Sequence, residues 1–321
     1  MCVGEREPRL HVISTSRRRN MTTTVAGGLV VTAALAYVIA DRREAFETAL
    51  RSVPLWILLV AAALQLLALV ARTEAWRVCV AAAGGTVRRR CLFRAAALGY
   101  LGCQLNSQVG TAARIGALRR AAPAQCPRVP ALIAAEVPIL AIEAGLAALT
   151  SFTLVGPLGL PWWLPLVLLA AAGLLVATLG NVARRWREGF WSGLAVLRCA
   201  RGRSRVFALV LVAVFAQIAR NWLMLRAVGV EASVLDATAV LIAMVTLSQL
   251  PVGPSVGAAA VVLILGVHGA ALAAAAGVLL TATGTLGALA YAGWAGVDRL
   301  WTLRPRVPPT GEAQPAVGVA R

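Results

Sequence analysis

Long apolar runs, separated by short polar segments rich in arginine, make up most of this chain. An apolar run of roughly 20 residues is long enough to cross the hydrocarbon core of a membrane as an α-helix. Continuous apolar runs also argue against a β-barrel, whose strands alternate between apolar and polar positions. We therefore predict an all-α polytopic membrane protein with about six spanning helices. The predicted spans are residues 24–40, 54–71, 129–156, 164–181, 206–228 and 270–297.

Two further apolar segments, residues 92–122 and 237–267, are interrupted near their middle. A polar run that starts at Gln104 breaks the first, and prolines and glycines break the second. Hydrocarbon cannot satisfy the backbone groups that a helix break frees, so the interruptions must face protein or water. We predict two re-entrant helical hairpins, each of which enters and leaves the membrane on one side. The candidate gate positions in these hairpins are Gly110, Pro251, Gly253 and Gly257.

The two interrupted segments share a short sequence pattern. Residues 104–113 read QLNSQVGTAA and residues 249–260 read QLPVGPSVGAAA, so each has Gln-Leu, a break, and then Val-Gly with small residues. The arginine-rich segments place the two hairpins on opposite sides of the membrane, which predicts an inverted repeat of residues 54–156 and 206–297. Interrupted helices at matching positions of an inverted repeat indicate a transport site near the bilayer midplane.

Arginine dominates the charge of the chain. The net charge is +18, from 31 basic residues that are all arginine and 13 acidic residues. In a soluble protein such an excess would indicate nucleic-acid binding, but here 60% of the residues are hydrophobic and the arginines lie between the apolar runs. A topology signal with affinity for anionic lipid explains them better. We expect anionic membrane lipids as partners and no nucleic acid.

The same arginine pattern predicts a protein of the cell membrane, inner or plasma, with both termini in the cytoplasm. Residues 1–23 are expected to form a basic cytoplasmic tail, residues 24–301 a single membrane domain, and residues 302–321 a flexible C-terminal tail. Trp76 and Arg77 follow the second predicted span, so we expect them at the membrane interface.

Side chains that commonly carry metal or hydrolytic chemistry are scarce. The chain has two histidines, His11 and His268, and six cysteines without a C-x-x-C spacing. Its three aspartates occur singly, which leaves no acidic cluster for magnesium. The sequence contains no P-loop, no G-x-S-x-G and no H-E-x-x-H motif. We therefore expect no metal, no cofactor and no enzymatic activity.

Ionisable residues inside the predicted spans are candidates for a substrate site, because charge inside a membrane is costly. Glu136 and Glu143 are two helical turns apart and are expected on one face of their helix. Arg220 lies well inside residues 206–228, and it should pair with a glutamate or face water. Each of these side chains then contributes either to a structural ion pair or to substrate binding.

The hairpins supply further candidate substrate-binding residues. Arg114 either grips a lipid phosphate through its guanidinium or serves as an ordinary cytoplasmic arginine near the interface. Asn106, Gln108 and Gln249 either line a hydrated cavity or cap the ends of the broken helices. Both interpretations stay open for each residue.

The stretches that carry a family resemblance are Trp76-Arg77, residues 106–114, Glu136 and residues 251–257. They resemble the membrane region of lysylphosphatidylglycerol synthases, a broad family of flippase-like integral membrane proteins, and the resemblance covers roughly residues 54–301. Gly110 and Arg114 match the glycine and the final arginine of the family pattern P-G-R-x-G-E-x-x-R, and Thr111 stands in place of its glutamate.

The later stretch keeps the Pro/Gly character of a Pro-Gly-Gly-x-Gly pattern through Pro251, Gly253 and Gly257, and alanines replace the acid that usually follows. Val137 stands after Glu136 where the family usually has arginine. The resemblance implies movement of lipids with polar headgroups between leaflets. We expect the soluble domain that makes the aminoacyl lipid in full-length synthases to be absent.

We therefore expect a flippase-like protein that translocates or binds a polar-headgroup lipid or a lipid-linked precursor, with residues 92–122 and 237–267 as its gate. One alternative is a non-transporting scaffold or regulator of envelope lipid metabolism, with an envelope-biosynthesis enzyme as its partner. Another is a secondary transporter of small solutes that is coupled to protons through Glu136 or Glu143.

Overall fold

The computed structural model describes residues 51–104, 107–185, 188–247, 256–265 and 270–303, together with Glu44 and Thr48. All regular elements in these ranges are helices. Five helical segments are long and apolar enough to cross a membrane, namely residues 55–82, 129–154, 164–185, 200–227 and 272–301. The prediction of an all-α polytopic membrane protein is thereby confirmed. These segments overlap with five of the predicted spans, and the sixth, residues 24–40, lies outside the described residues.

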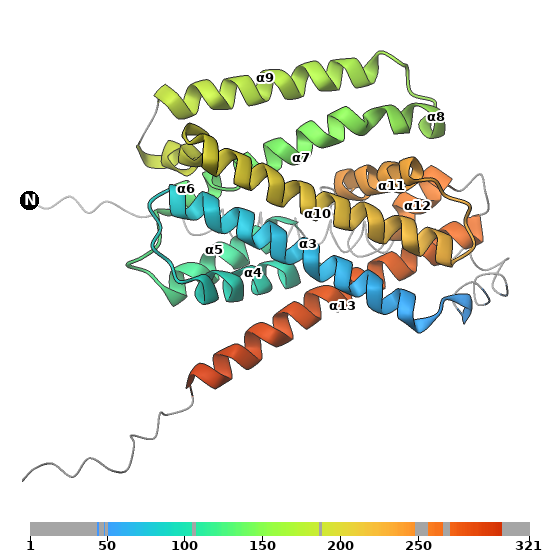
Figure 1. Cartoon of the computed structure of the whole chain (residues 1–321), viewed down its shortest axis with the longest axis horizontal. Helices are drawn as coiled ribbons and strands as arrows, with labels where there is room; N and C mark the ends of the chain where they lie inside the picture. The colour runs from blue at the N-terminus through green and yellow to red at the C-terminus, as the bar shows by residue number, and fades with distance from the viewer. Residues whose placement is uncertain are drawn as a thin grey trace, which may run out of the picture.

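Four of these segments are single helices, and one is interrupted (Figure 1). The single helices are α3 (Leu55–Ala82), α9 (Leu164–Arg185), α10 (Ala200–Ala227) and α13 (Ala270–Leu303). The interrupted segment consists of α6 (Val129–Ala134), α7 (Val137–Thr150) and η1 (Ser151–Leu154), and α8 (Val155–Leu158) follows it. The 3-10 helix η2 (Gly189–Arg198) joins α9 to α10.

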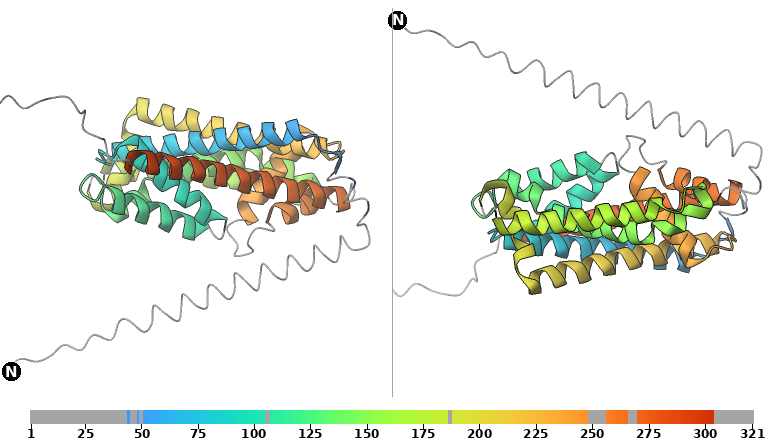
Figure 2. Two further views of the ribbon diagram at one scale, coloured as in Figure 1. Left: turned by 90° about the horizontal axis from the view of Figure 1, so that it is seen from below. Right: turned by 90° about the horizontal axis from the view of Figure 1, so that it is seen from above.

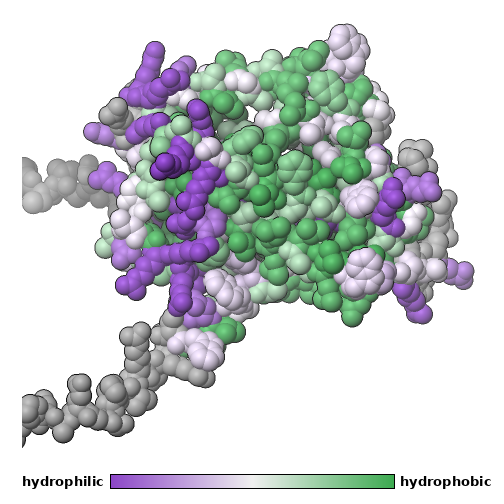
Figure 3. Space-filling model, in the orientation of Figure 1, coloured by the Kyte–Doolittle hydropathy of each residue, from purple (hydrophilic) through white to green (hydrophobic). Residues whose placement is uncertain are grey.

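The surface separates into two polar ends and an apolar band. Figure 3 shows hydrophilic side chains most densely at the end where α3 finishes and α10 starts, which we call the arginine-rich end. Between the two ends the surface is hydrophobic, and large side chains such as Leu59, Leu174 and Leu289 are more than half exposed there. Exposure of this kind is stable only when lipid covers the band.

Both predicted hairpins are pairs of short helices. The first consists of α4 (Arg89–Cys103) and α5 (Ser107–Ala121), and the second of α11 (Val234–Leu247) and α12 (Val256–Leu265). Helices of 10 to 15 residues are about 15–23 Å long, which is less than the roughly 30 Å of a hydrocarbon core. Their lengths therefore suit the predicted re-entrant hairpins and not full crossings.

The hairpins occupy opposite ends of the molecule in both side views (Figure 2). The α4–α5 pair shares a buried core with the arginine-rich ends of α3, α10 and α13, where Trp76, Leu92 and Leu118 are buried. The α11–α12 pair shares a second core with the other ends of these helices, around Leu225, Val240 and Leu280. Two separate cores thus hold one hairpin each.

The helices follow the same order in the two predicted repeat units. A long helix, α3 or α10, comes first, then a short pair, and then a segment that crosses the bundle. The first helices pack along each other in opposite directions (Figure 1), with Ala68 and Ala71 against Ala213 and Ala216. Small residues at such a contact let helix backbones approach closely in a membrane. The repeat itself stays a prediction.

The third predicted span differs in detail from the expectation of one helix over residues 129–156. Its helix breaks between Ala134 and Val137, so that Glu136 lies at the interruption. Pro138 follows directly, and proline suits the first turn of a new helix because it has no N–H to donate. The break therefore positions Glu136 separately from Glu143.

Candidate functional site

Arg114 is a buried residue of α5 with a carboxylate partner. Its side chain forms an ion pair with Glu136, and its guanidinium carbon lies 4.4 Å from the ring centroid of Trp76. Only 8% of Arg114 is exposed. This burial does not agree with one of the two interpretations of the sequence, in which Arg114 is an ordinary cytoplasmic arginine near the interface. An ion pair plus an aromatic face is the environment in which guanidinium burial is least costly.

Glycine contacts inside the first hairpin set the position of Arg114. A Cβ atom on Gly110 would lie 2.7 Å from the carbonyl oxygen of Gly99, and one on Gly99 would lie 2.8 Å from the Cβ of Arg114. Neither glycine could carry a side chain without separating α4 from α5. The candidate gate residue Gly110 is therefore a packing position that brings Arg114 inward toward Trp76 and Glu136.

Trp76, which we predicted at the membrane interface together with Arg77, is fully buried in the protein, so its ring does not contact lipid headgroups. The helix α3 also continues to Ala82, well past the predicted end of the span at residue 71. A prediction from apolar length alone ends a span at the first charged residue. Here the charges that follow residue 71 have partners inside the protein, so the helix continues through them.

A second ion pair joins α7 to α3. Arg72 Nη2 is 2.8 Å from Glu143 Oε2, and both side chains are partly exposed. Glu136 and Glu143, which we expected on one face of one helix, thus contact two different arginines on α5 and α3. The arginine partner of neither glutamate could be deduced from the spacing of residues within 129–156.

Hydroxyl groups extend this polar region across the bundle. Tyr100 of α4 donates to the carbonyl oxygen of Leu69 at 3.0 Å, and Tyr291 of α13 donates to Thr73 Oγ1 at 3.2 Å. Thr73 itself donates to Leu69 O at 2.8 Å. Our sequence interpretation missed these residues. The two tyrosines inside apolar segments were the available signal, because a buried tyrosine hydroxyl needs a partner.

Ion pairs also fasten α4 at the arginine-rich end. Glu74 of α3 pairs with Arg77 at 2.5 Å and with Arg89. Asp298 of α13 pairs with Arg94 at 2.6 Å. The base of the first hairpin is therefore attached to both α3 and α13 by charge.

Arg220 has a different environment from the one we predicted. Its Nη1 donates to Gln65 Oε1 of α3, and its Nη2 is 3.4 Å from Asn221 Oδ1. Only 5% of Arg220 is exposed, and no carboxylate pairs with it among the described residues. The predicted glutamate partner is thus replaced by neutral amides. Within the described part of the chain, Arg220 Nε and Asn221 Nδ2 lack a hydrogen-bond partner.

Helix α13 packs closely over Arg220 and Gln65. A Cβ atom on Gly284 would lie 3.5 Å from Arg220 Nη1, and one on Gly287 would lie 2.5 Å from Gln65 Cγ. Thr285, between these glycines, donates to Gln104 Oε1 at 3.1 Å and so ties the inner end of α4 to the same stretch of α13.

The remaining predicted site residues are placed as follows. Gln108 is exposed on α5 and lines a cavity of about 610 Å³ with Ser107, Thr111 and Arg119. Gly257 lies in the first turn of α12. Asn106, Gln249, Pro251 and Gly253 lie outside the described residues.

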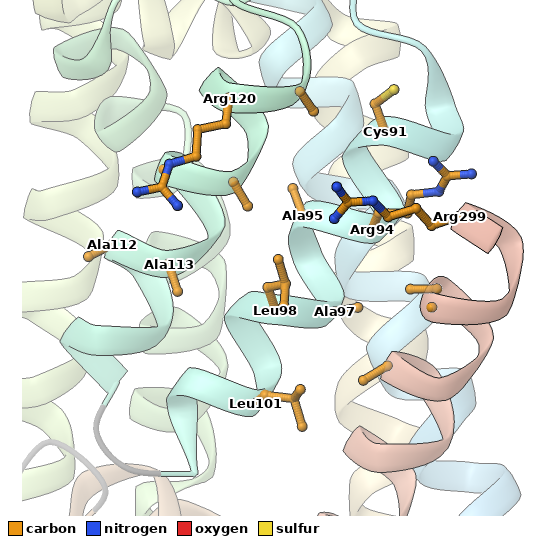
Figure 4. Close-up of a pocket in the computed structure, with 16 residues that line it drawn as sticks. Cys91, Arg94, Ala95, Ala97, Leu98, Leu101, Ala112, Ala113, Arg120 and Arg299 are labelled. Atoms are coloured by element: carbon orange, nitrogen blue, oxygen red, sulfur yellow. The ribbon is translucent and has the colours of Figure 1, made fainter. Parts of the chain in front are cut away.

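A cavity of about 780 Å³ lies between α4, α5 and α13 (Figure 4). We call it the hairpin cavity. Figure 4 shows Arg94, Arg120 and Arg299 at one end of it, and Leu98 and Leu101 further along toward the inner end of α4. Alanines and glycines form most of the remaining wall. The cavity thus combines a cationic end with apolar sides, a combination that suits a molecule with an anionic head and a hydrocarbon tail.

Among the described residues, no group of three or more His, Cys, Asp or Glu side chains is placed to hold a metal ion. No protein-family model matches the chain, and no curated protein matches it. The functional argument therefore rests on the cavity and the buried charges of this chain itself.

Proposed function

We propose that this chain is a flippase-like integral membrane protein that binds and translocates a lipid, or a lipid-linked precursor, with an anionic or zwitterionic phosphate-containing headgroup. The hairpin cavity carries the proposal. Arginine binds phosphate through paired N–H donors, and Arg120 and Arg299 stand at the cationic end of the cavity. The apolar side chains along its walls can contact acyl chains, which are unfavourable in water.

The route toward the midplane is supported by the polar groups beyond the cavity. Gln104 lies at the inner end of α4 and accepts a hydrogen bond from Thr285, and Gly284, the neighbour of Thr285, lies against Arg220. Arg220 offers buried positive charge beside neutral amides. We propose that the headgroup moves from the inner end of the hairpin cavity to Arg220. Hairpins at the two opposite ends (Figure 2) provide the matched gates that alternating access requires.

We further propose that the arginine-rich end faces the cytoplasm of a cell membrane, since positive residues accumulate on that side. Cys199 directly precedes α10, which starts at this end, and its thiol is exposed. A membrane-impermeant thiol reagent should label it in inside-out vesicles and not in right-side-out cells, with Cys199→Ser as the control for specificity. Labelling only from the outside of intact cells would reverse the proposed orientation.

No observation favours the two alternatives over lipid translocation. A proton-coupled solute transporter would use Glu136 or Glu143, yet arginines hold both carboxylates in ion pairs. A scaffold that does not transport would need none of the donors that surround the hairpin cavity. Our proposal assigns no enzymatic activity to the described residues.

The test is a lipid-transfer measurement in reconstituted vesicles that carry fluorescent phosphatidylglycerol. The wild type should expose the lipid to a quencher outside faster than empty vesicles do. Leu98→Trp fills the hairpin cavity and should return the rate to that of empty vesicles. Leu174→Trp is the matched control, because Leu174 is 67% exposed on α9, away from that cavity.

Two results would overturn the proposal. One is a wild-type rate equal to that of empty vesicles. The other is an equal loss of transfer in Leu98→Trp and Leu174→Trp, because the effect would then not depend on the hairpin cavity. Size-exclusion profiles of both variants in detergent verify that each folds.

A further inference from the structure

Helix α9 stands apart from the rest of the bundle. In its most apolar stretch only 6% of the residues are buried, against 33–50% in the other four crossing segments. Pro165 and Ala183 are its only buried residues. Figure 1 shows α9 at the outer edge of the bundle, and its helix neighbours are α7, η1 and η2. A helix with so little protein contact leaves space on its inner side.

That space is a groove of about 1370 Å³ between α7, α9 and α10, which we call the α9 groove. Leu146 and Leu149 of α7, Val176 and Leu179 of α9 and Phe207 of α10 make its sides apolar. Its volume exceeds the roughly 300–1,000 Å³ of pockets for drug-sized molecules. An empty apolar space of this size is unstable next to a bilayer, so we expect lipid acyl chains to occupy it.

One end of the α9 groove is strongly basic. Arg184, Arg198, Arg201 and Arg203 line it there, and none of the described lining residues is acidic. Arg198 donates to Ala183 O at 2.5 Å, which holds η2 against the end of α9. The four arginines come from α9, η2 and α10, so their positive charges converge from three elements on one site.

The N-terminus of α10 adds to this positive potential. The first turn of a helix carries partial positive charge and disfavours arginine, yet Arg201 and Arg203 lie there. Hydrogen bonds from the backbone N–H groups of Gly202 and Arg201 lower the pKa of the Cys199 thiol, so negative charge is stabilised at this end. An anion beside Arg201 and Arg203 would relieve the repulsion among these groups.

We propose that the α9 groove holds an anionic phospholipid as a resident component of the protein. Its phosphate lies among Arg184, Arg198, Arg201 and Arg203, and its acyl chains fill the space between α9 and α10 over α7. Basic pockets between membrane helices are known to bind anionic headgroups. No residue of α4 or α5 lines this groove, so the site is separate from the proposed translocation path. The lipid attaches α9 to the bundle.

The test uses the full chain in detergent after extensive delipidation, with thermal unfolding as the readout. Phosphatidylglycerol or cardiolipin should raise Tm, whereas phosphatidylcholine and inorganic phosphate should not. The double variant Arg201→Gln/Arg203→Gln should lose the response. The matched double variant Arg185→Gln/Arg205→Gln removes the same charge from exposed positions of α9 and α10 that do not line the groove, and it should keep the response.

Several outcomes would overturn the resident-lipid proposal. These are an equal rise in Tm with phosphatidylcholine, an equal rise with phosphate alone, and an equal loss of response in both double variants. If Arg201→Gln/Arg203→Gln does not fold, Leu179→Trp replaces it, because a large side chain in the apolar part should displace the lipid without any change of charge. Native mass spectrometry of the undelipidated protein should then show a bound anionic lipid in the wild type and not in Leu179→Trp. This readout does not depend on lipid transfer, so it stays interpretable even if the proposed function fails.

Discussion

Arg114 and Arg220 are both buried, but of the two only Arg114 has a charged partner among the residues that the structure describes. Arg114 lies in the half of the molecule that contains the first hairpin, where Glu136 neutralises it and Trp76 covers its face. Arg220 lies where α3, α10 and α13 cross, and its partners are the amides of Gln65 and Asn221. The same side chain is therefore used in two electrostatically different ways.

The difference indicates two roles. A buried ion pair with good geometry holds segments together, because the loss of either partner leaves an isolated charge. A buried guanidinium without a carboxylate lowers stability, and such residues inside membranes are commonly retained for function. We assign Arg114 to fastening the hairpin and Arg220 to contact with the lipid phosphate.

The largest expected effect comes from Arg114→Gln, which leaves the Glu136 carboxylate buried without its charge partner. The free energy of unfolding should fall by about 3–5 kcal/mol, measured by thermal or chemical unfolding in detergent. Arg114→Gln/Glu136→Gln removes both charges and should recover most of the loss. If the double variant is as unstable as the single one, the ion pair is not what holds the hairpin.

Gly110→Ala should have the next largest effect, because its Cβ would meet the backbone of α4 and move Arg114 away from Glu136. Overpacking of this kind costs about 1–3 kcal/mol. Gly116→Ala on the same helix is the control, since no atom lies within 4 Å of the added methyl group. Equal unfolding temperatures for the two variants would show that the close approach of α4 and α5 does not position Arg114.

Arg72→Gln breaks the other ion pair of the first half, and it should cost far less than Arg114→Gln. The Arg72 side chain is 36% exposed, against 10% for that of Arg114, so this pair is less completely buried. We expect a loss of about 1 kcal/mol, near the upper end of the range for exposed ion pairs, because the pair is only partly buried. A loss as large as that of Arg114→Gln would mean that burial does not distinguish the two pairs.

Arg220→Gln should change stability least of all. Replacement of a buried charge by a neutral side chain of similar shape is often neutral or stabilising, and glutamine can still donate to Gln65. Thermal unfolding should therefore give a Tm equal to or above that of the wild type. A clear fall in Tm would instead make Arg220 a structural residue, like Arg114.

The sequence alone predicts the helices well and their contacts poorly. Apolar length was sufficient to locate five of the six predicted spans, although not their ends or the break at Glu136, and the polar run after Gln104 was sufficient to locate the break between α4 and α5, because both signals are local. The partners of the buried charges are distant in the chain. Gln65 is 155 residues from Arg220, and Arg114 reaches Glu136 only because Gly99 and Gly110 let α4 and α5 touch. The helix break at Glu136 and the burial of Trp76 depend on these distant contacts, so the local sequence pattern could not predict them.

The most direct test of the account is the transfer rate of phosphatidylglycerol in vesicles that contain wild type or Arg220→Gln, together with the Tm of each protein. We predict that Arg220→Gln is as stable as the wild type and transfers lipid no faster than empty vesicles. A variant that transfers lipid at the wild-type rate would contradict the assignment of Arg220 to the lipid phosphate.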